Sequence, residues 1–118
     1  MRTVPPLAAT VILTAAALIS PGVAAAHDWV VNSSPAEKSA GPAPAQVSIT
    51  FNEPVTNAEI WVSGADHVAW STGPTSGSGA TYSIALRPAL PPGDYTVHWK
   101  NNAADGDDVH SSWEFTVR

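Results

Sequence analysis

After residue 45, short runs of alternating apolar and polar residues are separated by segments rich in proline and glycine. The clearest run is 46–51, in which Val47, Ile49 and Phe51 would share one face of an extended chain. No convincing amphipathic helix follows residue 26. Short alternating runs with frequent turns are typical of antiparallel sheets, so this pattern limits the chain to an all-β fold.

The alternation predicts about seven strands and a candidate core. The strands are expected at residues 29–31, 46–51, 58–63, 67–71, 81–86, 95–100 and 109–117. The core is expected to contain Tyr82, Ile84, Leu86, Tyr95, Val97, Trp99, Trp113, Phe115 and Val117. Residues 72–79 are rich in Gly and Ser and contain Pro74, so they are predicted to form a loop. We therefore predict a single β-sandwich domain over residues 27–118.

The alternation does not assign every aromatic residue to the core. Trp29, Trp61 and Trp70 have no clear place, and a row of exposed tryptophans would instead suggest a platform for sugars. His98 alternates with inward-facing neighbours and is expected on the outer surface, as is His67, which follows a predicted turn.

Composition restricts the chemistry of any site. The chain has no cysteine, and its single methionine is Met1. Disulfides, thiolate zinc sites, iron–sulfur clusters and a thioether site for Cu(I) are therefore excluded, and a metal would bind to nitrogen and oxygen. Five Lys and Arg against ten Asp and Glu, a net charge of −5, leave no basic face for nucleic acid.

The N-terminal segment has the features of a signal peptide. Arg2 precedes an apolar run over residues 7–19, and Ala24-Ala25-Ala26 matches the small-residue rule for cleavage. The run is shorter than the roughly 20 residues that a membrane-spanning helix needs, which argues against the alternative of an anchor. We expect residues 1–26 to be removed, with export of a mature chain without a membrane span to a periplasm or the exterior.

Cleavage after Ala26 would create a chelating residue. His27 would then offer two nitrogens, the α-amine and the imidazole Nδ1, to one metal ion. Together with a further imidazole and a carboxylate, this set favours tetragonal Cu(II). Cleavage after Ala25 would remove the chelate, because Ala26 would then carry the α-amine.

A second group of metal-ligating residue types lies between the last two predicted strands. Asp105, Asp107, Asp108 and His110 fall within six residues, and Gly106 allows the chain to turn tightly. Such a loop can bind a metal, but it is also typical of a solvated acidic hairpin. A calcium-binding loop is a further interpretation, because carboxylates alternate along the segment. The loop is, however, too short for an EF-hand.

The mature chain resembles the bacterial CopC family of copper-binding proteins. The resemblance rests on His27, Ser34-Pro35-Ala36, Thr50-Phe51-Asn52-Glu53-Pro54-Val55, Leu90-Pro91-Pro92-Gly93-Asp94-Tyr95-Thr96-Val97-His98-Trp99, Ala104-Asp105-Gly106 and Phe115-Thr116-Val117, in this order. It implies an immunoglobulin-like or cupredoxin-like β-sandwich. It also implies an exported protein that binds one Cu(II) ion and acts in copper resistance or copper delivery.

The resemblance implies a ligand set with one departure. The family's N-terminal His and the Asp of its Asp-Gly-His motif correspond to His27 and Asp105, but the motif's His is replaced by Asp107. A family glutamate near the copper corresponds to Glu53, whose implied role is to orient a ligand. Three possibilities remain open: His110 supplies the missing ligand, Asp107 supplies it, or the site has been lost.

Geometry separates the two candidate replacements. In an extended strand, residues 107 and 110 point to opposite faces, so His110 would need a bulge or an early turn at Asp108 to turn inward. Asp107 stands at the position of the motif's His, but its harder oxygen would bind Cu(II) more weakly than an imidazole nitrogen.

The leading functional interpretation is a non-enzymatic Cu(II) carrier or buffer. Its expected partners are the copper ion and either a membrane copper transporter or another periplasmic copper protein, and the protein is expected to be a monomer. One alternative is a metal-free immunoglobulin-like interaction module. Another is a small copper-brace oxidative enzyme, although a chain of this length has little room for the flat substrate face of such enzymes.

Overall fold

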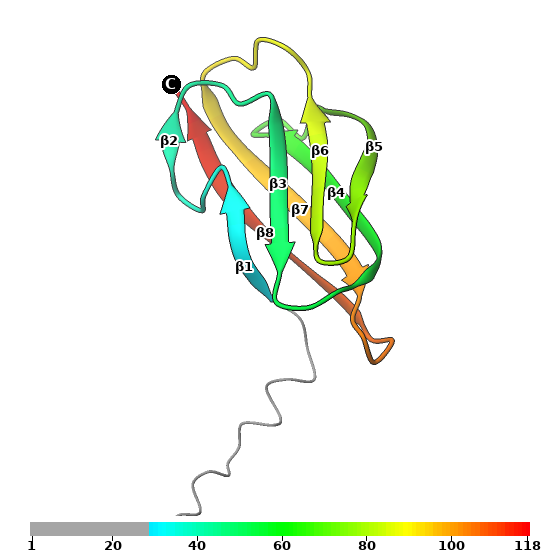
Figure 1. Ribbon diagram of the computed structural model, residues 1–118. Coiled ribbons are helices and arrows are strands. Elements are labelled where there is room, and N and C mark those ends of the chain that lie inside the picture. The colour runs from blue at the N-terminus through cyan, green and yellow to red at the C-terminus, as the bar shows by residue number, and fades with distance from the viewer. Residues whose placement is uncertain (1–28) are drawn as a thin grey trace, which may run out of the picture.

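Two four-stranded sheets pack face to face in a β-sandwich (Figure 1). The computed structural model describes residues 29–118, so the predicted signal peptide and His27 lie outside the described residues. The strands are β1 (Val30–Ser34), β2 (Ala40–Gly41), β3 (Gln46–Phe51), β4 (Thr56–Gly64), β5 (Ser71–Ser78), β6 (Thr81–Leu86), β7 (Gly93–Asn102) and β8 (Asp108–Val117). One sheet has the order β1-β3-β6-β5 and the other β2-β8-β7-β4. The predicted all-β sandwich is confirmed, with eight strands instead of about seven.

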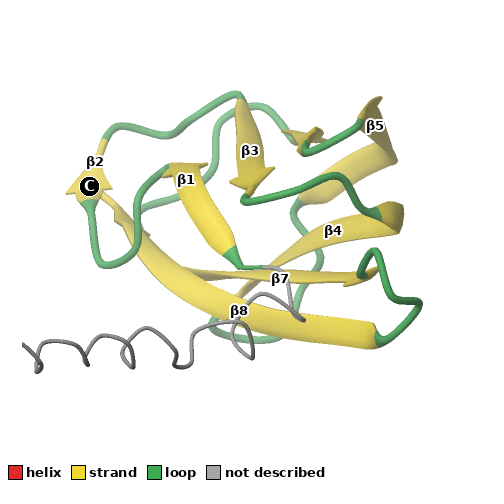
Figure 2. Ribbon diagram, turned by 60° about the horizontal axis from the view of Figure 1, so that its bottom comes forward, coloured by secondary structure: helices red, strands yellow, loops and turns green. Residues whose placement is uncertain are grey.

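The core lies between the two sheets, where the alternating residues of both inner faces meet (Figure 2). Buried residues include Val47, Ile49, Phe51, Ile84, Leu86, Tyr95, Val97, Trp99, Trp113, Phe115 and Val117. This set contains every predicted core residue except Tyr82, which is half-buried and packs against the cluster. Trp99 and Trp113 are core residues, whereas Trp29 and Trp61 are 48% and 41% exposed.

The prediction for residues 67–79 is wrong. Of the expected strand 67–71, Ala69 forms an isolated bridge with Ser63 and Ser71 already begins β5, and the expected loop 72–79 lies almost entirely within β5. β5 is an edge strand that pairs with β6, and the register shifts between Thr72 and Ser76 around Pro74. The ladder needs only main-chain groups, and a bulge on an edge strand accommodates proline, so β5 needs no alternating apolar residues.

The strands bring three segments to one end of the sandwich. The start of β1, the end of β3 and the β7–β8 hairpin all lie toward the lower end of Figure 1. β7 and β8 stay in unbroken antiparallel register from the Gly93–Val117 pair to the Asn102–Asp108 pair. Within residues 29–118, no helix is long and apolar enough to cross a membrane.

Candidate metal centre

The turn between β7 and β8 is held by its own main-chain hydrogen bonds. The N–H of Ala103 donates to the carbonyl of Asp107 at 2.9 Å, and the N–H of Gly106 donates to the carbonyl of Ala103 at 2.8 Å. Gly106 has a φ of 92°, which residues with a Cβ rarely adopt. Because Ala103 is buried, the turn is anchored to the core at its first residue.

Asp105 and Asp107 lie together in this turn. Oδ1 of Asp105 accepts a hydrogen bond from the N–H of Asp107 at 3.0 Å, which is an Asx-turn. This bond fixes the Asp105 carboxylate relative to the next two residues and leaves its other oxygen available to a ligand. Both side chains are exposed, as a site that receives a metal from solution requires.

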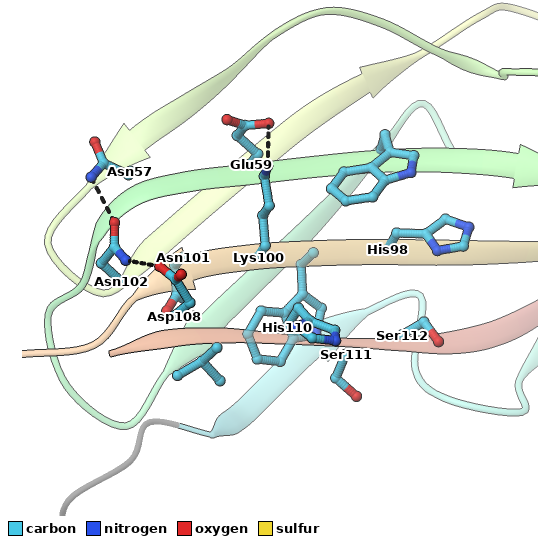
Figure 3. Close-up of a pocket in the computed structure, with 13 residues that line it drawn as sticks. Asn57, Glu59, His98, Lys100, Asn101, Asn102, Asp108, His110, Ser111 and Ser112 are labelled. Carbon is cyan, nitrogen blue, oxygen red and sulfur yellow. Dashed lines mark hydrogen bonds and ion pairs between the residues drawn. The ribbon is translucent and has the colours of Figure 1, made fainter. Parts of the chain in front are cut away.

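Asp108 makes a different contact, because it begins β8. Its Oδ1 accepts a hydrogen bond from Nδ2 of Asn102 at 2.5 Å, and Oδ1 of Asn102 accepts one from Nδ2 of Asn57 at 2.7 Å. The three side chains come from β8, β7 and β4 and lie in a line across the sheet (Figure 3). No local sequence pattern indicates a role for Asn57 or Asn102, because their contact depends on strand register.

The first described residue is hydrogen-bonded to the residue that follows β3. The N–H of Trp29 donates to Oδ1 of Asn52 at 2.7 Å, and the N–H of Asn52 donates to the carbonyl of Trp29 at 2.9 Å. Glu53 follows directly and is half-buried. The chain two residues after His27 is thus held beside Asn52 and Glu53.

His110 lies on the outer face of β8, where its strand partner is Lys100. No register shift occurs between Asp108 and Val117, so the bulge that would turn His110 inward is absent from β8. The residue lines two grooves. One, here called the edge groove, has a volume of about 570 Å³ and is also lined by Trp29, Val31 and Ser111. The other, here called the outer groove, has a volume of about 550 Å³ (Figure 3).

The outer groove also contains His98, which has a structural role. Its ring stacks on Trp61 at 5.3 Å with an interplanar angle of 10°, and its Nε2 lies 3.0 Å from Oγ of Ser63. His98 lies on the outer face as expected, although it is half-buried. His67 is exposed, also as expected.

Within residues 29–118, no group of three or more His, Asp or Glu side chains is close enough to hold a metal ion. The described residues contribute Asp105 and Asp107 in the turn, His110 in β8 and Glu53 after β3. A complete site at this end of the sandwich would require a donor from outside the described residues.

The fold and this end of the molecule define a small β-sandwich domain whose carboxylate-bearing hairpin lies at the same end as the start of its first strand. The family model described as CopC domain matches residues 30–118. The chain therefore belongs to the CopC domain family.

Relatives with known names agree with this assignment. The chain is 30% identical to "Copper resistance protein C" of Pseudomonas syringae pv. tomato, over 92% of this chain and 94% of that protein. PcoC, described as a methionine-rich copper resistance protein from Escherichia coli, has a similar structure with a TM-score of 0.60 and 26% identity, over 79% of this chain and 100% of PcoC. CopC from Methylosinus trichosporium OB3b shares the fold, with a TM-score of 0.69 and 24% identity over 77% of this chain and 93% of that one.

Proposed function

We propose that this chain is an exported copper-binding protein that holds one Cu(II) ion and acts as a carrier or buffer in copper resistance or copper delivery. Membership of the CopC domain family and the names of the relatives support a copper-related role. The role needs only a site that binds and releases the ion, so no catalytic residue is proposed. Export to a periplasm or the exterior follows from the predicted signal peptide.

The proposed ligands are His27, through its α-amine and imidazole, and Asp105. The observation that carries this assignment is the pair of hydrogen bonds between Trp29 and Asn52, at the end of the sandwich that bears the hairpin. Two residues span at most about 7 Å, so His27 is proposed to bind the ion at this end. Glu53 follows Asn52 and is proposed to orient the α-amine or the imidazole of His27.

The third ligand is proposed to be either His110 or Asp107. His110 lines the edge groove together with Trp29, which favours contact with a residue shortly before Trp29. Asp107 shares a turn with Asp105, which favours joint binding of one ion by both carboxylates. The two assignments differ in their donor atoms, nitrogen or oxygen, and can therefore be separated by experiment.

The proposed oxidation state of the copper ion rests on the donor atoms that the chain can offer. PcoC is described as methionine-rich, whereas the only methionine in this chain is Met1 and cysteine is absent. Thioether and thiolate donors, which suit Cu(I), are therefore lacking after export. Nitrogen and carboxylate oxygen suit Cu(II). The proposed partner is a membrane copper transporter or another periplasmic copper protein, to which a monomer delivers the ion.

The test is calorimetric titration of Cu(II) into exported protein whose N-terminus has been verified by mass spectrometry. We expect one equivalent bound with a dissociation constant below micromolar. A matched control protein with one alanine added before His27 keeps every side chain but moves the α-amine, and it should bind much more weakly. Wild-type binding no tighter than micromolar would contradict the proposal and favour a metal-free interaction module.

A further inference from the structure

A chain of side-chain hydrogen bonds crosses three strands directly behind the metal-binding turn proposed above. Asn57 of β4 donates to Asn102 of β7, and Asn102 donates to Asp108 of β8, through the amide and carboxylate atoms already described (Figure 3). Each side chain is thereby oriented by a neighbour on the adjacent strand. A carboxylate that accepts from an amide in this way is fixed in direction as well as in position.

The first residue in this series of hydrogen bonds, Asn57, has an unusual backbone conformation. Asn57 has a φ of 54° and lies where the β4–β7 register shifts between Thr56 and Glu59. Residues with a Cβ rarely adopt positive φ, but Asn tolerates it better than most. The irregularity in β4 thus places an amide beside Asn102.

The last residue in this series of hydrogen bonds, Asp108, connects the series to the turn. Asn102 and Asp108 form the final pair of the β7–β8 ladder, and the turn begins one residue later with the hydrogen bond from Ala103 to Asp107. Asp107 in turn donates to Asp105. Consecutive hydrogen bonds and neighbouring residues therefore link β4 to the carboxylate of Asp105.

We propose that Asn102 and Asp108 are positioning residues for the metal-binding turn: they hold the turn that carries Asp105 in place for Cu(II) without contacting the ion. This inference rests on the proposed function. Hydrogen bonds behind metal ligands orient those ligands, and their loss typically lowers metal affinity about 10- to 100-fold. Asp108 is therefore assigned a different role from the two carboxylates that precede it.

Three variants separate positioning from direct ligation. Asn102→Ala and Asp108→Ala remove the hydrogen bond, whereas Asp108→Asn retains an Oδ1 acceptor, removes the charge and replaces Oδ2 by an NH2 group. We expect the two alanine variants to bind Cu(II) about 10-fold or more weakly and to change the electron paramagnetic resonance spectrum of the bound ion. Asp108→Asn should bind within about twofold of wild type and keep the wild-type spectrum, as expected if the acceptor matters more than the charge.

A matched control lies on the same face of the sheet. Glu59 and Lys100 form an exposed ion pair at 3.8 Å between β4 and β7, and the double variant Glu59→Gln, Lys100→Met should leave Cu(II) binding unchanged. If Asp108→Asn bound as weakly as Asp108→Ala, the carboxylate charge itself would matter and the positioning role would be overturned. Wild-type affinity and spectrum in Asn102→Ala would overturn it as well.

A measurement without copper keeps this inference separate from the proposed function. In the metal-free protein, the N–H of Asp107 is hydrogen-bonded within the turn, so its exchange with solvent reports how well the turn is held. We expect Asn102→Ala to speed this exchange, measured by nuclear magnetic resonance, while the circular dichroism spectrum stays that of the folded protein. Unchanged exchange would overturn the positioning role, whereas absent Cu(II) binding in the wild type would overturn the proposed function.

Discussion

The three carboxylates of the β7–β8 hairpin differ in what they contact. Asp105 accepts a main-chain hydrogen bond within the turn, and Asp108 accepts one from the amide of Asn102. Asp107 lies between these two anchored residues and is exposed. The two candidates for the proposed third copper ligand are therefore Asp107 in the turn and His110 two residues into the strand.

Two alanine variants should identify that ligand. If His110 binds the ion, His110→Ala should lower Cu(II) affinity about tenfold or more, because an imidazole donor is lost. The Asp107→Ala variant should then have little effect. If Asp107 is the ligand, the results should be reversed.

The measurement combines calorimetric titration with the nitrogen hyperfine pattern in electron paramagnetic resonance. Loss of one coupled nitrogen in His110→Ala would identify an imidazole ligand directly. His98→Ala is a suitable control, because this histidine stacks on Trp61 and has no proposed role in the site. Wild-type affinity in both test variants would exclude both residues as the third ligand.

At the scale of strands, β5 shows how an irregular edge can join a sheet. It is built from residues 71–78, rich in Ser and Gly, and pairs with β6 on both sides of a register shift. At Gly77 the chain has a φ of 131°, and a Cβ there would lie 2.3 Å from the carbonyl oxygen of Thr81. The close approach of β5 to β6 therefore requires glycine at this position.

Gly77→Ala is expected to destabilise the protein by about 2 kcal/mol or more, because both the φ value and the contact with Thr81 oppose a side chain. Gly73→Ala is the matched control in the same strand. Gly73 also has a positive φ, 75°, but a Cβ added there would meet no atom within 4 Å, so only the backbone cost of about 1 kcal/mol applies. Urea unfolding of both variants measures the difference, and equal losses would contradict the steric explanation.

At the scale of the whole molecule, aromatic residues pack together in the core, on the inner face of the β2-β8-β7-β4 sheet. Tyr95 of β7 stacks on Phe115 of β8 at 5.5 Å and meets the edge of Trp70 at 6.2 Å. Its hydroxyl donates to the carbonyl of Pro91 at 2.5 Å. Burial, and to a lesser extent the charge of Asp66, raises the pKa of Tyr95 above its ordinary value.

Alkaline conditions should therefore weaken the fold. Because the pKa of Tyr95 is higher in the folded than in the unfolded state, the folded protein holds this proton more tightly. The associated stability is present below about pH 10 and is lost as pH rises from there through the folded pKa.

Urea unfolding between pH 8 and pH 11 tests this dependence. Tyr95→Phe should lower stability by about 1 kcal/mol at pH 8, through loss of the bond to Pro91, and should reduce the decline at higher pH. An equally steep decline in the variant would assign the effect to other groups.

The sequence alone determined the sandwich and most of its core, because a two-residue period fixes which side chains face inward. It also determined that a metal must bind to nitrogen and oxygen, because Cys is absent and the one methionine is Met1. The strand in residues 71–78 was not predicted. The pairing of an edge strand depends on main-chain groups and needs no alternation of apolar residues in the sequence.

Only the tertiary structure decided which polar residues meet. The register of β7 and β8 places His110 opposite Lys100, and it pairs Asn102 with Asp108. The hydrogen bonds between Trp29 and Asn52 hold the first described residue against the residue that precedes Glu53, although the two partners are 23 residues apart in the sequence. These contacts join residues far apart in sequence or depend on exact strand alignment, and neither property is encoded in a local pattern.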